Sequence, residues 1–232
     1  METSARSDGP LLRVSIRGRW RDGTHDVRRR ILQEADEHEL AALLAESLGH
    51  GPATGLTAAP LVAGAELAGE DVDYALWLAV GREAPSETGV DEPVAPAVAV
   101  AWAVVEALGG EAPTSVEVEV VSPLDGESSR RRLWSTGLWL SYVTGPVAPE
   151  IPAVVTVASG SPIPEAAVDR LVRTVSQETA ALPLDSLTVS DDRRRAELRL
   201  SLPAWDRQVA GYLAAHAAHA HDGPLTATVA RG

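Results

Sequence analysis

The chain has 232 residues, of which 45% are hydrophobic, so it is long and apolar enough to bury a sizeable core and is not intrinsically disordered. It contains no cysteine, which excludes disulfides, thiolate metal sites and cysteine nucleophiles. Its net charge of −13, with no recognisable nucleic-acid-binding motif, argues against nucleic acid as a partner.

The first ten residues are polar, and we expect them to be disordered. Apolar and polar side chains alternate over residues 11–20, which predicts a strand with one buried face. The Asp-Gly pair at 22–23 predicts a hairpin turn that leads into a returning strand over residues 28–32. A helix is expected between Asp36, which begins a capping box, and Gly49.

The middle of the chain continues with strands and one apolar helix. Residues 50–70 are rich in Gly and Ala and indicate one weak strand near Leu61, and residues 72–83 predict another strand. Residues 93–108 form the longest apolar stretch, but it is too short to span a bilayer and predicts a buried helix. Residues 114–122 then alternate valine with glutamate, as a half-buried strand does.

The second half repeats this order. Strands are expected over residues 135–145 and 153–159, followed by a helix that starts near Pro164. A hairpin with its turn at residues 190–192 comes next, then a helix opened by Pro203 and a final strand, "LTATVA".

These elements predict an α+β fold with mixed or antiparallel sheets and helices on one face, built from two related α/β-sandwich-like halves. The second half has the β-α-β-β-α-β order of ferredoxin-like domains, which suggests an internal duplication. The predicted units are a disordered N-terminus (1–10), an N-terminal half (11–122), a bridging hairpin and strand (123–150) and a C-terminal half (151–232).

Three arginine runs, "DVRRRIL", "SSRRRLW" and "DDRRRAEL", each follow a turn signal. Successive side chains of a strand point to opposite faces, so three adjacent arginines cannot converge on one phosphate. We therefore interpret the runs as hairpin structure, with anion binding as the alternative.

Acidic residues concentrate in the middle of the chain. Residues 66–129 hold fourteen acids and one base, Arg82, whereas the other 19 acids are balanced by 19 arginines. Such a segment is either a solvated face or a surface that attracts a basic protein partner. The residues assigned to partner binding are Asp71, Asp73, Glu83, Glu87, Asp91, Glu92 and, as an exposed aromatic anchor, Trp139.

Two other clusters carry chemistry. Ser159, Gly160 and Ser161 join a strand to a helix, where backbone amides can hold an anion, although Ser161 also suits a turn. The segment "HAAHAHD" offers a metal site made of nitrogen and oxygen ligands, or a set of histidines that simply favours a helix end. Its candidate ligands are His216, His219, His221 and Asp222.

Two functions are compatible with these features. The first is a non-catalytic interaction protein of the accessory, inhibitor or immunity type, whose acidic middle segment docks a basic partner. The second is a small-molecule-binding or enzymatic domain that uses a cleft between the halves. We expect a cytoplasmic protein without cofactor or membrane attachment, and a homodimer is compatible with either function.

Overall fold

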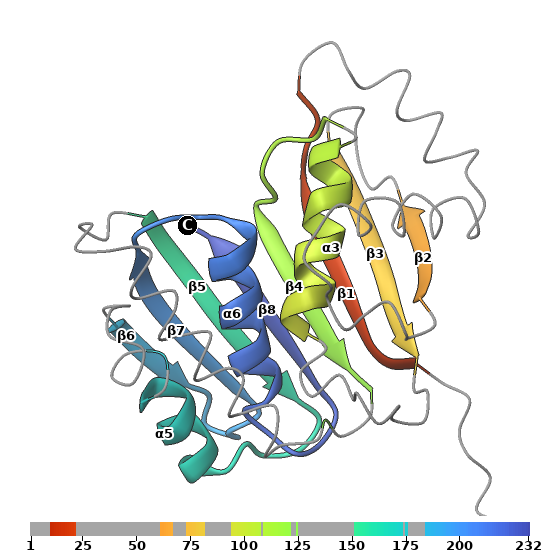
Figure 1. Ribbon diagram of the computed structural model, residues 1–232. Helices are drawn as coiled ribbons and strands as arrows, with labels where there is room; N and C mark the ends of the chain where they lie inside the picture. The colour runs from red at the N-terminus through yellow and green to blue at the C-terminus, as the bar shows by residue number, and fades with distance from the viewer. Residues whose placement is uncertain are drawn as a thin grey trace, which may run out of the picture.

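The computed structural model describes residues 10–21, 61–66, 73–81, 94–107, 109–121, 124, 151–173, 175 and 184–232. Within these ranges the protein is an α+β fold in which three helices cover one face of an antiparallel sheet (Figure 1). In chain order the elements are β1 (Pro10–Arg19), β2 (Leu61–Glu66), β3 (Asp73–Gly81), α3 (Val94–Ala107), β4 (Ser115–Val120), β5 (Ile151–Ser159), α5 (Glu165–Arg173), β6 (Leu184–Val189), β7 (Arg195–Leu202), α6 (Arg207–Ala218) and β8 (Leu225–Arg231).

The eight described strands form one sheet in the order β2-β3-β1-β4-β8-β5-β7-β6. Every neighbouring pair is antiparallel, so no parallel pair of the expected mixed type occurs among the described strands. The joint between the predicted halves is the β4–β8 pair, in which Val116 lies opposite Val229 and Val118 opposite Ala227. One continuous sheet therefore runs through both halves.

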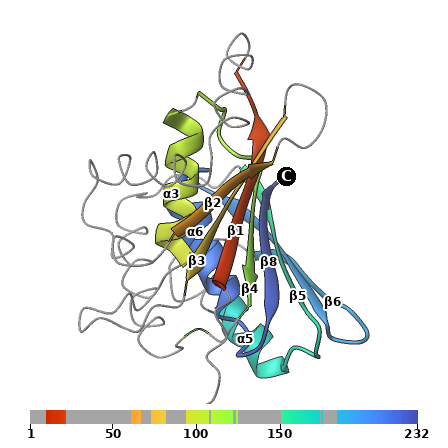
Figure 2. The ribbon, with the colours of Figure 1, turned by 90° about the vertical axis from the view of Figure 1, so that its right-hand side faces the viewer.

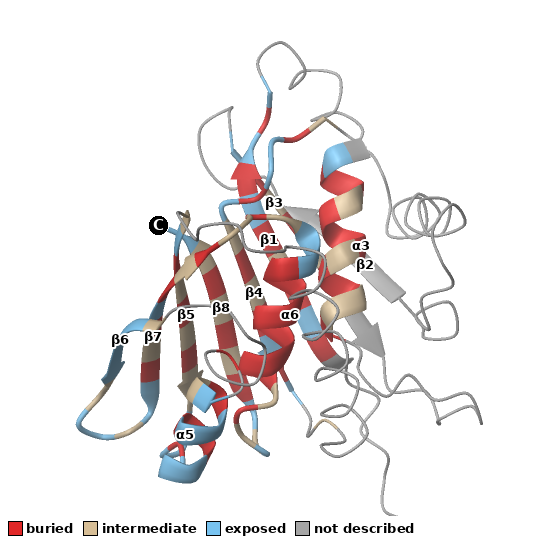
Figure 3. Cartoon of the chain, turned by 60° about the vertical axis from the view of Figure 1, so that its left-hand side comes forward, coloured by how far each residue is buried: buried red, intermediate tan, exposed pale blue. Residues whose placement is uncertain are grey.

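The core lies between this sheet and the helices, because alternate strand residues are apolar and point the same way (Figure 3). Leu12, Val14 and Ile16 of β1 are completely buried, as the alternation over residues 11–20 predicts. The helix α3 is apolar on nearly all sides and lies against both the sheet and α6. Its Trp102 contacts Trp205, with ring centroids 5.9 Å apart.

The α3–α6 contact depends on a glycine. A Cβ atom placed on Gly211 would lie 3.2 Å from the carbonyl oxygen of Ala95, so a larger side chain would push the helices apart. The absence of that side chain allows the two helices to pack closely, with α6 over β4 and β8 and α3 over β1 and β3.

The last helix begins later than the sequence suggests. It starts at Arg207 rather than Pro203, because the Asp206 side chain accepts hydrogen bonds from the backbone N–H groups of Gln208 and Val209, both at 2.9 Å. Trp205 precedes the helix and is nevertheless buried, and its Nε1 donates to the Pro113 carbonyl at 2.6 Å. This bond ties the start of α6 to the loop before β4.

Most of the predicted elements that fall on described residues are confirmed, including the weak strand at Leu61. The third arginine run is a hairpin, with Arg193 in its turn at φ 58° and β7 beginning at Arg195. The first two runs lie outside the described residues. So do residues 1–9, the expected helix over 36–49 and nearly all of the bridging segment 123–150.

No helix in the described part of the chain combines the length and the apolar character that a membrane span requires.

Candidate functional site

The face of the sheet that points away from the described helices, here called the open face, is the most extensive candidate surface. Figure 2 shows α3 and α6 on one side of the strands and none of the described helices on the other. The open face is formed by the outward-pointing residues of the described strands, such as Arg13, Arg17, Glu117 and Glu119. Their partial or full exposure contrasts with the burial of the residues on the opposite face of β1, β4 and β7, such as Val14, Val118 and Leu198.

Charged residues occur in separate strands on this face. On β1, Arg13, Arg17 and Arg19 are exposed, and on the adjacent β4, Glu119 lies directly opposite Arg13. On β7 the carboxylate of Glu197 lies 2.9 Å from Arg199 and 3.5 Å from an Nη atom of Arg195. The first set has three arginines against Asp73, Glu117 and Glu119, and the β7 set has two arginines against Glu197, so neither set shares the strongly acidic character of the chain as a whole.

An uncharged strip two strands wide separates these sets. Thr228 of β8 pairs with Thr156 of β5, and Thr228 also pairs with Glu117. The strip is half-buried and its side chains are small, so it is flat. Its members are Thr226, Thr228, Ala230, Val154, Thr156 and Ala158.

Trp77 is an aromatic residue on this face that the sequence did not single out. It lies opposite Ser15 on β1, is half-buried, and has the Arg13 guanidinium 5.1 Å from its ring centroid. Such a cation–π contact contributes about 0.5–1 kcal/mol at an exposed site. The alternation of residues 72–83 places Trp77 on the face opposite the buried one, and this pattern could have identified it as a surface aromatic residue.

A hollow of about 490 Å³ opens at the end of the face where β1 finishes and β3 begins. Tyr74 forms part of its wall, and its hydroxyl donates to the carbonyl oxygen of Glu111 at 2.9 Å. A Cβ atom on Gly18 would collide with the Tyr74 phenol, so the glycine makes room for that ring. The hollow is lined by Arg17, Gly18, Arg19, Asp73, Tyr74, Ala75, Glu111 and Thr114.

The electrostatics of the hollow are mixed. The Nε atom of Arg19 lies 3.5 Å from an Asp73 carboxylate oxygen, and both side chains are more than half exposed. Burial raises the pKa of the Tyr74 phenol well above its usual value, and the charges of Glu111 and Glu106 add to the increase. Tyr74 therefore remains a neutral hydrogen-bonding group at physiological pH.

The structure brings the serine cluster and one histidine together across 60 residues of sequence. Ser161 Oγ lies 3.2 Å from His221 Nε2 and 3.4 Å from Ser159 Oγ. Ser159 Oγ donates to the Pro224 carbonyl at 3.2 Å, and Gly160 beside it is exposed. These contacts connect the end of β5 to the turn before β8 and satisfy the serine hydroxyls internally.

The four residues of the predicted metal site do not converge. His216 is buried against Tyr212, with ring centroids 4.3 Å apart, while His221 contacts Ser161 instead. Burial, together with the nearby His219, lowers the pKa of His216 from 6.5 to about 3. In the described ranges no group of three or more His, Asp or Glu side chains is placed to hold a metal ion.

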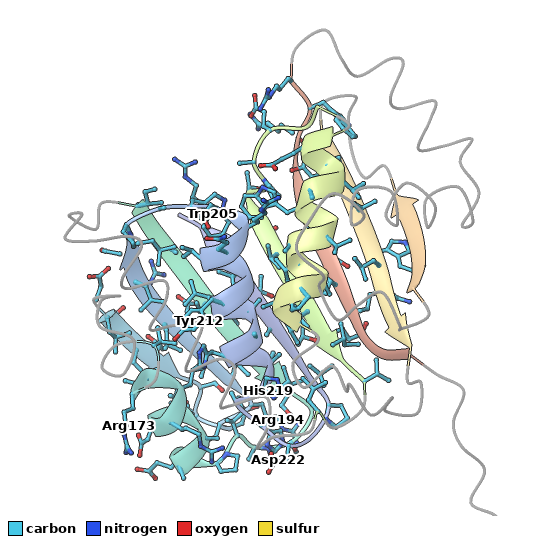
Figure 4. The ribbon with its side chains drawn as sticks, viewed as in Figure 1. Arg173, Arg194, Trp205, Tyr212, His219 and Asp222 are labelled. Atoms are coloured by element: carbon cyan, nitrogen blue, oxygen red, sulfur yellow. The ribbon has the colours of Figure 1, made fainter. Side chains whose placement is uncertain are left out.

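Figure 4 shows how this end of the molecule is arranged. His219, Arg194 and Asp222 lie near the turn before β8, while Trp205 lies at the opposite end of α6. Tyr212 projects from the middle of the same helix.

Of the residues assigned to partner binding, the structure describes only Asp73, which lies in the hollow. Asp71, Glu83, Glu87, Asp91, Glu92 and Trp139 are outside the described residues, so their assignment stays a prediction. Glu117 and Glu119, also within the acidic segment, lie on the open face.

Comparison with known proteins adds no functional assignment. No family model matches the chain, and no curated protein matches it either.

Proposed function

We propose that the protein is a non-catalytic interaction factor, of the accessory, inhibitor or immunity type, that docks a basic protein partner on its open face. The observation that carries the proposal is the arrangement of that face: a flat strip of small residues between two strand groups that each carry charges of both signs, with none of the described helices over it. A surface of this kind accepts another protein without burying an unpaired charge at its centre.

Docking of the partner has two components, long-range attraction and short-range contact. The net charge of −13 attracts a basic partner over a long range and raises the association rate. The strip and the half-buried Trp77 supply the contact area, because aromatic anchors contribute most to interface energy. Glu117 and Glu119, the acids on β4 beside the strip, pair with positive groups of the docked partner.

Native mass spectrometry of the untagged protein, captured gently from its own cell extract, tests the proposal. We expect a second, basic polypeptide that is lost as the salt concentration is raised, since surface charge pairs are screened by salt. A complex that survives unchanged at high salt would argue against electrostatic docking. A doubled mass without another polypeptide would indicate a homodimer instead.

A second candidate function is small-molecule binding, and the hollow beside Tyr74 is the observation that favours it. Its volume of about 490 Å³ is within the range of ligand pockets. Its lining residues belong to β1, β3 and the segment before β4. The candidate site is thus inside the N-terminal half and not in a cleft between the halves.

We also infer that the two halves are related ferredoxin-like units. The strand order β4-β1-β3-β2 in the first half corresponds to β8-β5-β7-β6 in the second, and α3 corresponds to α6. In this correspondence an approximate twofold axis passes through the β4–β8 pair. The first half ends with β4 and the second half with β8. A structure of residues 151–232 alone that keeps its fold would support this division.

A further inference from the structure

The hollow has firmly positioned walls. The backbone N–H groups of Glu111 and Thr114 donate to the carbonyls of Arg19 and Arg17, each at 2.8 Å. Thr114 Oγ1 donates to the Arg17 carbonyl at 3.2 Å. Together with the Tyr74–Glu111 bond, these contacts fix the segment 111–114 alongside β1. The space therefore results from the fold and from the small side chain of Ala75, while Gly18 leaves room for the Tyr74 ring in the wall.

The two arginines of the hollow have different surroundings. Arg19 lies opposite Asp73 and forms an ion pair with it. On the other side of β1, the backbone N–H of Glu111 donates to the Arg19 carbonyl. Arg17 lies between Ala75 and Ser115, which are small and uncharged. Within the described ranges Arg17 makes no ion pair, so its guanidinium is available to a carboxylate.

Acidic groups lie one row further along the sheet. Asp73 is the diagonal neighbour of Arg17, and diagonal residues in an antiparallel pair are about 7–8 Å apart. Glu111 borders the same end of the hollow from the opposite side and makes no ion pair in the described part of the chain. A cation between Asp73 and Glu111 would thus lie about one side-chain length from a carboxylate bound to Arg17.

Neither an anion nor a cation alone suits this arrangement. A simple anion bound to Arg17 would be repelled by the nearby carboxylates of Asp73 and Glu111 and by the net charge of −13 of the chain. A simple cation bound to these acids would be repelled by the guanidinium groups of Arg17 and Arg19. A ligand that carries both charges satisfies each group, and the planar guanidinium is the cation that pairs best with carboxylates.

We propose that the hollow binds a small zwitterion of the basic amino acid type, with its carboxylate on Arg17 and its side-chain cation between Asp73 and Glu111. Tyr74 and Thr114 line the site as neutral hydrogen-bonding groups. This site rests on the second candidate function, small-molecule binding in the hollow, and does not depend on docking, because the strip of small residues on β5 and β8 is a separate part of the open face.

Titration of the full chain with L-arginine, followed by NMR or calorimetry, tests the site. We expect saturable binding with a Kd on the order of 1 mM, as suits charged contacts that remain partly exposed. Two analogues remove one charge each: agmatine lacks the carboxylate and L-norvaline lacks the guanidinium. Each should bind at least about fivefold more weakly, and this comparison needs no variant.

Matched variants then assign the two ends of the ligand. Arg17→Gln should weaken L-arginine to the level of agmatine and leave agmatine unchanged, whereas Glu111→Gln should weaken it to the level of L-norvaline. Arg13→Gln removes another exposed arginine of β1 that does not line the hollow, and should have no effect. Absence of saturation, equal binding of all three compounds, or an equal loss in Arg13→Gln would overturn the proposal. Docking at the strip is measured by partner capture in native mass spectrometry. A failure of arginine binding therefore does not count as a failure of docking.

Discussion

The buried His216 makes the stability of the fold dependent on pH below neutrality. Its pKa is about 3 in the folded protein and 6.5 as a free side chain, chiefly because burial disfavours the imidazolium. Above pH 6.5 the side chain is neutral in both states and has no influence. Below pH 6.5 the unfolded chain binds a proton that the folded chain excludes, so stability falls by about 1.4 kcal/mol per pH unit until about pH 3.

Between pH 7 and pH 5 this residue alone should therefore remove about 2 kcal/mol from the free energy of unfolding. That is a large part of the 5–15 kcal/mol typical of domains. The assay is urea unfolding of the wild type and His216→Leu at both pH values. The variant should lose about 2 kcal/mol less than the wild type over this interval.

Leu213→Met, an apolar substitution in the same buried helix, serves as the control and should follow the wild type. Equal pH dependence in His216→Leu and the wild type would refute the reasoning, because it would mean that His216 titrates alike in the folded and unfolded states.

Three further substitutions test the packing around the β4–β8 joint. Gly211→Val should lower the free energy of unfolding by about 1–3 kcal/mol, since its side chain would press on the backbone of Ala95; denaturant unfolding measures the loss. Asp206→Ala should cost about 1 kcal/mol by removing the helix cap, while Asp206→Asn should cost little, and thermal unfolding compares the two. Trp205→Phe should cost about 1–3 kcal/mol because it leaves the Pro113 carbonyl without its donor; an equal stability to wild type would show that water replaces the bond.

Local sequence patterns predicted the elements well. The alternation around Val14 and around Val118 identifies strands because it matches the two-residue period of a half-buried sheet. The sequence pattern places the start of the last helix too early because Pro203 suits a first helical turn, whereas the stronger local signal is the capping side chain of Asp206. The turn signal before the third arginine run was also sufficient to predict the β6–β7 hairpin.

Contacts between distant segments could not be predicted in this way. The pairing of Val116 with Val229 depends on the register of strands more than 100 residues apart, which no local pattern encodes. The same holds for the contact of Ser161 with His221, although the sequence marks each of them as a candidate site residue. The hollow is not predictable from the sequence because its lining comes from three separate segments, with the Tyr74 ring packed against Gly18.

The central claim, that the open face docks a basic partner, is tested most directly by two arginine substitutions. Thr228→Arg places a bulky positive charge at the centre of the strip, and Ala166→Arg places the same side chain on the exposed surface of α5. Capture of the partner polypeptide from the cell extract is then quantified by native mass spectrometry. We predict that Thr228→Arg abolishes capture while Ala166→Arg retains it; undiminished capture by a correctly folded Thr228→Arg protein would contradict the account.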